Sequence, residues 1–396
     1  HLESMISVTH RIGDQERSAR LLSRAIAMSQ SVVERAYYHY SIALIEIERK
    51  ETSAAEWHFR EALRLDPAHH EARDALGNLY RDNGDFRKAV DLLEEARACT
   101  ADAQRKAHYA LEAAQIYSDR LGENTKAVDL YEAALRIQPS SMQASLPVVE
   151  RYYQQGRWSE LASVLDSLLR TQQAASLHTS EIAELYLMAG TAALKLQKYE
   201  KARQMFAECS EHSGSRLESA LGAARACMAM DKHLDALSYI EKAMALHERL
   251  GHSPDEMVVT LSLSAKANLS VGNHDKAQSH LKICAELGDV AAMGTLGELY
   301  ALRGMHNEAV RVNLERASKL ESSERIQVLC EVSDLLHSTM GDTEAAIDLC
   351  WQALAVDKTS RDALHRLAVL YSETEQWRDA IKTIVRMASL EKSAIR

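Results

Sequence analysis

The sequence predicts an all-α protein built from about eleven repeated helix-turn-helix units. Only 4 prolines and 15 glycines occur in 396 residues, and 46% of the residues are hydrophobic, a composition that favours helix. Alternating Val, Ile and Thr runs bounded by turns are missing, so we expect essentially no β-strand. A pattern of small and large apolar residues recurs about every 34 residues, which indicates a tandem array.

The clearest unit spans residues 70–103 and holds two helical patterns separated by a turn at Gly84. Small residues at Gly77, Ala89 and Ala96 fall where two antiparallel helices would touch. We therefore expect the two helices to approach closely at Gly77. Such a pair cannot bury its apolar stripe alone, so the unit needs a neighbour on each side.

The unit resembles a tetratricopeptide repeat. The matching positions are Leu76, Gly77, Tyr80, Ala89 and Ala96 in this unit, and Ala55, Phe59, Ala62 and Pro67 in the preceding one. The resemblance extends over essentially the whole chain. It implies a right-handed superhelical solenoid in which the first helix of each repeat lines a concave, protein-binding face.

Along the chain we divide one continuous array into residues 1–175 (repeats 1–5), 176–257 (repeats 6 and 7) and 258–396 (repeats 8–11). Polar insertions are expected at 176–182 and 251–257. The turns that contain Gly122 and Gly341 each carry one extra residue. Together with Trp158 and Trp377, these glycines mark a block near 70–170 that recurs near 290–389. We interpret the recurrence as a duplication that places the same kink in both copies.

Charge and cysteine usage restrict the partners and the compartment. The net charge is −10, which argues against tracking a nucleic-acid backbone. None of the six cysteines forms a CxxC motif, and Cys209 and Cys284 fall where a small core residue belongs. This pattern favours a reducing, cytoplasmic compartment. No apolar run approaches about 18 residues, so we expect no membrane insertion.

Motifs that carry chemistry are missing from the sequence. There is no GxSxG, HExxH or glycine-rich phosphate loop, and the 17 histidines lack the spacing of metal ligands. We therefore predict a non-catalytic protein without a cofactor or a metal site.

The expected binding surface follows from the family register. An apolar strip with two cations is predicted in the middle of the array, with further anchors near the N-terminus. The residues are Leu187, Leu194, Leu221, Arg225, Met228, Lys266 and Leu269, with Tyr37, Tyr40 and Asn78. The alternative is that this register is off by one and the strip belongs to the core. Asn78 matches the asparagine of the family's carboxylate clamp, but Asp74 stands where the clamp has lysine, so we expect no clamp.

The sequence therefore predicts a scaffold or adaptor that binds a peptide or protein segment in the concave groove. Two alternatives stay open: a regulatory or recruiting arm of a larger enzyme or complex, and a nucleic-acid-binding helical repeat. No polar capping helix is evident at the C-terminus, so the end repeats are candidates for homo-oligomer contacts.

Overall fold

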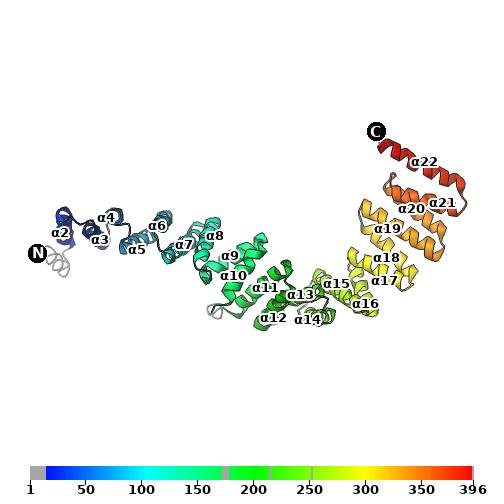
Figure 1. Ribbon diagram of the computed structural model, residues 1–396, viewed down its shortest axis with the longest axis horizontal. Helices are drawn as coiled ribbons and strands as arrows, with labels where there is room; N and C mark the ends of the chain where they lie inside the picture. The colour runs from blue at the N-terminus through cyan, green and yellow to red at the C-terminus, as the bar shows by residue number, and fades with distance from the viewer. Residues whose placement is uncertain (1–14, 172–177, 214–215, 251–252, 395–396) are drawn as a thin grey trace. The chain divides into compact units, whose positions relative to one another are not determined.

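The computed structural model describes residues 15–171, 178–213, 216–250 and 253–394. These residues form α-helices and two short π-helical turns, and no β-strand occurs among them (Figure 1). The predicted all-α fold of tandem helix pairs is confirmed. The chain divides into two compact units, residues 1–196 and 197–396, which we describe separately.

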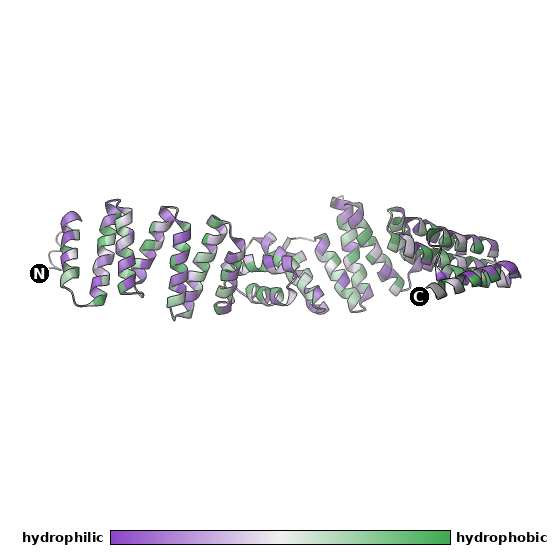
Figure 2. Ribbon diagram, turned by 90° about the horizontal axis from the view of Figure 1, so that it is seen from above, coloured by the Kyte–Doolittle hydropathy of each residue, from purple (hydrophilic) through white to green (hydrophobic). Residues whose placement is uncertain are grey.

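In the first unit, each α-helix packs against the α-helix that follows it in the chain. The helices are α2 (Gln15–Met28), α3 (Val32–Glu48), α4 (Thr52–Leu65), α5 (His70–Asp82), α6 (Phe86–Cys99), α7 (Ala103–Ile116), α8 (Asn124–Ile137), α9 (Met142–Gln155), α10 (Trp158–Leu169) and α11 (Thr179–Lys195). Hydrophobic and hydrophilic residues alternate along these helices, as expected for helices with one buried side (Figure 2).

The second unit repeats this order, and successive α-helices again pack together. The helices are α12 (Tyr199–Ser213), α13 (Leu217–Ala229), α14 (His233–Leu250), α15 (Pro254–Ser270), α16 (His274–Glu286), α17 (Val290–Leu302), α18 (His306–Lys319), α19 (Ser322–Leu335), α20 (Thr343–Val356), α21 (Arg361–Glu373) and α22 (Trp377–Ala394).

A residue with positive φ marks every turn from the first to the second helix of a pair. The residues are Lys50, Gly84, Gly122, Gly156, Gln197, Asp231, Gly272, Gly304, Gly341 and Glu375. A left-handed residue at this place ends a helix and turns the chain back. Glycine adopts the conformation without strain, whereas a side chain makes it unfavourable. The backbone thus repeats one turn geometry even where glycine is missing.

The extra residue predicted in two turns is present, but it lies in the helix rather than in the loop. The π-helical turns η1 (Tyr117–Leu121) and η3 (Leu336–Met340) end α7 and α19, respectively. Gly122 and Gly341 follow them with φ of 67° and 69°. Widening the last helical turn absorbs one residue without lengthening the connection.

The two predicted insertions also contribute to helices. Residues 179–182 begin α11, and residues 254–257 begin α15. Ser253 Oγ accepts a hydrogen bond from the Glu256 N–H, and Glu256 Oε2 accepts one from the Ser253 N–H at 3.0 Å. This capping box, with Pro254 at the first helical position, starts α15 a turn earlier than a standard repeat.

A Cβ atom would meet much closer neighbours at Gly222 than at Gly77. A Cβ atom on Gly77 would lie 3.8 Å from Arg81 Nη2 and 3.9 Å from Leu92 Cδ2, which is ordinary contact. A Cβ atom on Gly222 would lie 2.7 Å or less from three ring carbons of Phe206. Gly77 is buried where α5 packs against α6, as expected for a small residue, and the site has room for the single carbon of alanine.

Candidate partner-binding surface

The first helix of each pair exposes one side to solvent, which we call the first-helix face. Its central position follows the small residue that the repeat places in the core. This position is exposed at Leu44, Asn78, Gln115, Glu150, Arg225, Lys266, Glu298, Asp334 and Val369. It is half-buried at Thr191. The role of this position in binding stays a prediction.

In the second unit, the predicted strip is less exposed than expected. Arg225 on α13 and Lys266 on α15 are exposed, and Met228 and Leu269 are half-buried against the core. Leu221 is only 7% exposed. It belongs to a core cluster with Ala243, onto which Leu263 of α15 packs. The expectation of an accessible Leu221 fails because the neighbouring first helix covers it.

In the first unit, the predicted residues of α11 are Leu187 and Leu194, and both are half-buried. Between them Thr191 donates a hydrogen bond from Oγ1 to the Leu187 carbonyl at 2.9 Å. This bond turns the hydroxyl toward its own helix. The α11 face therefore offers partly covered apolar side chains and no charged group at its centre.

The first unit also carries a longer apolar surface on α3, of which the sequence analysis identified only two members. We call it the α3 stripe, formed by Val33, Tyr37, Tyr40, Leu44 and Ile47. Val33 is 66%, Tyr37 58%, Leu44 39% and Ile47 36% exposed. The missed signal was the alternating spacing of four and three residues, which places all five side chains on one side of a helix.

Aromatic contacts hold the centre of the α3 stripe in place. The Tyr40 ring lies 5.0 Å from the His69 ring and 6.1 Å from the Phe59 ring, measured between centroids. Tyr37 lies 6.4 Å from Tyr40. Burial raises the pKa of Tyr40, and the carboxylates of Glu71 and Asp74 raise it further. These two groups of α5 therefore lie close enough to Tyr40 to act on its hydroxyl.

The α5 face beside the stripe is polar. Asn78 is exposed and accepts a hydrogen bond from Arg81 Nη2 at 2.9 Å. Arg81 also approaches Glu112 of α7 at 3.8 Å. Asp74 is exposed and has no ion-pair partner within the described ranges. Of the three predicted residues, Tyr37 and Tyr40 thus lie on the apolar face of α3. Asn78 lies on the polar face of α5 in the next repeat.

A histidine pair lies between α3 and α4. The Nδ1 atoms of His39 and His58 are 3.0 Å apart, so one ring donates a hydrogen bond to the other. Burial lowers the pKa of His39, and burial together with the charge of His39 lowers the pKa of His58 to about 4. The pair is therefore neutral at pH 7, where it connects the two helices.

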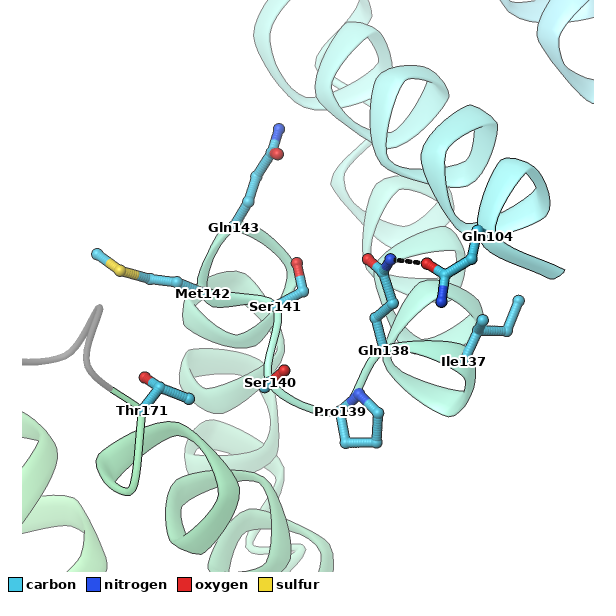
Figure 3. Close-up of a pocket in the computed structure, with 9 residues that line it drawn as sticks. All are labelled: Gln104, Ile137, Gln138, Pro139, Ser140, Ser141, Met142, Gln143 and Thr171. Atoms are coloured by element: carbon cyan, nitrogen blue, oxygen red, sulfur yellow. Dashed lines mark hydrogen bonds between the residues drawn. The ribbon is translucent and has the colours of Figure 1, made fainter.

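Other hollows and clusters offer less chemistry. Figure 3 shows a depression at the turn before α9, where Gln138 donates a hydrogen bond to Gln104 beside Pro139 and Ser141. Its lining is polar and contains no acidic or basic side chain. Over the part of the chain that the structure describes, no three His, Cys, Asp or Glu side chains are arranged to hold a metal ion.

The thiols are mostly buried in the helix packing. Cys209 and Cys284 are fully buried, as the repeat pattern predicted, whereas Cys99 is exposed. Burial raises the pKa of Cys330 to about 11, so this thiol stays protonated. None of the described helices combines the length and the apolar character that crossing a bilayer requires.

Profiles of the tetratricopeptide repeat match residues 75–142, 183–211 and 363–394. A search of curated proteins finds no match.

Solved structures with similar chains include the anaphase-promoting-complex hetero-tetramer Cut9–Hcn1, at 13% identity, covering 98% of this chain and 93% of that one, with a TM-score of 0.32. The complex of Naa15 and Naa10 with HypK is 16% identical over 99% of this chain and 63% of that one, with a TM-score of 0.39. A tetratricopeptide repeat protein from Parabacteroides merdae is 15% identical over 77% and 98%, with a TM-score of 0.30. At these identities and scores we draw no functional argument from them.

Proposed function

Because the chain belongs to the tetratricopeptide-repeat family, we propose that it is a non-catalytic scaffold that binds a segment of a partner protein in the family's concave groove. The observation that carries the proposal is the exposure of one register position along the first helices, with apolar residues on some and charged residues on others. Such a surface suits recognition of an amphipathic or extended segment.

The proposed contacts comprise the exposed or half-buried members of the predicted set. In the second unit these are Arg225, Met228, Lys266 and Leu269, and in the first unit Leu187, Leu194, Tyr37, Tyr40 and Asn78. Leu221 is left out because its side chain is buried. The exposed cations Arg225 and Lys266 would pair with acidic groups of the partner, while Met228 and Leu269 would contact its apolar groups.

The proposal places the protein in the cytoplasm and gives it no cofactor. Five of the six cysteines are buried and the described chain contains no disulfide, which agrees with a reducing compartment. A role as an arm of a larger enzyme or complex is the alternative, and it would use the same surfaces. Nucleic acid is the weaker alternative, because the net charge of −10 opposes binding to phosphates.

A second candidate function is self-association through the end repeats. It is favoured by four exposed apolar side chains on one side of α22: Trp377, Ile381, Ile384 and Val385. Leu165 of α10 is the residue of the first unit that is equivalent to Ile384. It is fully buried, and α10 packs against the next helix, α11. Sedimentation of an Ile381→Glu, Val385→Glu variant tests this candidate, which fails if the unmodified chain sediments as a monomer.

The test of the scaffold is affinity capture from the lysate of the source organism. The variant Arg225→Glu, Lys266→Glu changes the first-helix face of the second unit. The matched control Lys276→Glu, Lys282→Glu makes the same charge change on exposed positions of α16. We expect a partner captured by the wild type and the control and lost from the first variant. Equal capture by all three would remove this site from the proposal.

A further inference from the structure

We propose that the α3 stripe binds one α-helix of a partner protein, whose apolar side is flanked by lysine or arginine. The inference deepens the scaffold function proposed above, on which it rests, by naming the site and the chemistry of the occupant. It is carried by the spacing of the stripe, by the way its tyrosines are held, and by the charges on its two borders.

The spacing points to a helical occupant. From Val33 to Ile47 the stripe side chains follow each other after four, three, four and three residues. An average of 3.5 residues is the repeat with which one helix lies along another over several turns. An extended peptide places alternate side chains on opposite sides and would meet this line at only a few points. The exposed stripe therefore fits a second helix laid along α3.

The tyrosines supply anchors that are ordered before binding. Tyr40 is half-buried between the rings of Phe59 and His69, and Tyr37 packs against Tyr40 while 58% exposed. Rings that are already fixed lose little conformational entropy when a partner covers them. Tyrosine is also enriched among the residues that dominate binding energy. The centre of the stripe thus has the character of an interface core.

Exposed carboxylates border the stripe on both helices. Glu34 and Glu48 follow directly after Val33 and Ile47 on α3, and Glu71 and Asp74 of α5 lie near Tyr40. Among the residues that the structure describes, the donors to Glu34 and Glu48 are the neutral groups of Ser29 and Gln15, respectively. An apolar partner helix placed here would be surrounded by negative charge, which favours cationic residues along its edges.

The cations of the two helices do not neutralise this border. They are Arg35, Arg73 and Arg81. Arg35 is half-buried near His39, and Arg73 is only 7% exposed. Arg81 is already bonded to Asn78 and paired with Glu112. The exposed charge beside the stripe is therefore mainly acidic.

Toward α5 the apolar surface ends after one repeat. At the α5 positions that correspond to Tyr37, Tyr40, Leu44 and Ile47, the residues are Glu71, Asp74, Asn78 and Arg81. Three of these are exposed and all are polar. On this side the site therefore ends at a charged edge, which fits a helix docked along α3 rather than a segment that continues across α5.

The test is selection of binders to the full chain from a displayed library of random 16-residue peptides, followed by affinity measurement by fluorescence anisotropy. We expect the enriched peptides to carry apolar residues at helical spacing flanked by Lys or Arg. Tyr37→Glu, Leu44→Glu should weaken their binding by about ten-fold or more. Glu71→Lys, Asp74→Lys should also weaken binding and reduce its sensitivity to salt.

Two matched controls change the same kinds of groups elsewhere. Leu234→Glu, Ile283→Glu replaces two exposed apolar residues on the second helices α14 and α16, and Glu241→Lys, Glu286→Lys reverses two exposed carboxylates on the same helices. Binding should be unchanged in both. Each variant is first checked by thermal melting, and Leu44→Ala, which adds no charge, replaces Leu44→Glu if the double variant unfolds.

Several results would overturn the inference. Enriched peptides that are acidic, or whose binding ignores the stripe variants, would place recognition elsewhere while leaving the scaffold function intact. Self-association of the chain that Leu44→Glu abolishes would make the occupant a second copy. Failure to enrich any peptide, combined with failure to capture any partner from the lysate, would contradict both the inference and the scaffold function.

Discussion

The two compact units use the same backbone devices but pack and expose different side chains at equivalent places. Each unit has one first helix that ends in a π-helical turn, η1 or η3, closed by Gly122 or Gly341 in the left-handed conformation. The helices that follow these turns, α8 and α20, have the same length. The turn geometry is therefore set by the backbone and does not depend on the surrounding surface.

The side chains packed against the first helices also differ, although the glycines compared are not equivalent: Gly77 lies seven residues before the turn residue Gly84, and Gly222 nine residues before Asp231. A methyl group fits at Gly77 of the first unit, whereas the Phe206 ring closes the space over Gly222 in the second. The first-helix face carries the apolar α3 stripe in the first unit and the isolated cations Arg225 and Lys266 in the second. The repeat thus determines the backbone position of a residue. The neighbouring side chains determine whether that residue is buried in the packing or exposed for binding.

The largest expected difference between the units concerns these two glycines. Gly222→Ala should lower the free energy of unfolding by about 3 kcal/mol, because the buried Phe206 ring must move. Gly77→Ala should raise it by up to about 1 kcal/mol through better helix propensity. Urea unfolding measures both changes, and Phe206→Leu should restore part of the loss in the Gly222→Ala background. Equal effects of the two alanines would contradict the packing difference.

Replacing the glycine that ends each π-helical turn should lower the free energy of unfolding by the same amount in both units. No atom lies within 4 Å of a Cβ placed on Gly122 or Gly341, so only the positive φ opposes a side chain. Each change to alanine should therefore cost about 1–2 kcal/mol. Urea unfolding of the two single variants gives the comparison. A difference larger than about 1 kcal/mol would mean that the two turns are not equivalent.

A smaller change in stability is expected at a turn position that holds glycine in the first unit and another residue in the second. Gly156 with φ 68° in the first unit corresponds to Glu375 with φ 58° in the second. Glu375→Gly should stabilise by about 0.5 kcal/mol, the relief of strain being partly offset by unfolded-chain entropy. Gly156→Ala should destabilise by about 1 kcal/mol. Thermal melting would contradict this account if Glu375→Gly lowered the melting temperature.

The histidine pair should make the stability of the first unit depend on pH below about 6.5. The folded pKa of His58, about 4, lies below its unfolded value of 6.5, so the unfolded state binds the proton more readily. The stabilisation is complete above about pH 6.5 and is lost as the pH falls from there toward 4. Hydrogen exchange at pH 7 and pH 5 should show α3 and α4 loosening in acid. His58→Gln should remove that pH dependence, and an unchanged profile would contradict it.

Much of the fold could be predicted from the sequence, because the residues concerned act on the backbone or the packing close to them in the chain. Ala62, Ala89 and Ala96 are buried where neighbouring helices pack, as the recurring small residues predicted. Gly84 and Gly341 turn the chain because they tolerate positive φ. Ser253, Pro254 and Glu256 also form a local start signal for a helix. That signal was present in the sequence and was interpreted as part of an insertion.

The site depended on contacts that sequence reasoning does not contain. Leu221 looked like a groove residue until the packing of α15 buried it. The space available for a side chain at Gly77 is limited by Leu92 and Arg81, whose side-chain positions are known only once the helices are packed together. The α3 stripe, by contrast, was readable from its spacing, since Val33, Leu44 and Ile47 continue the line of Tyr37 and Tyr40.

The account's central claim is that partners contact the first-helix face rather than the second helices. Thiol-labelling protection tests it in a Cys99→Ser background, since the other five cysteines are buried. Leu44→Cys reports on the first-helix face of α3, and Ala54→Cys on an exposed position of α4. With a selected peptide bound, labelling at position 44 should slow by about ten-fold while position 54 reacts as before. Protection at position 54 with none at position 44 would contradict the claim.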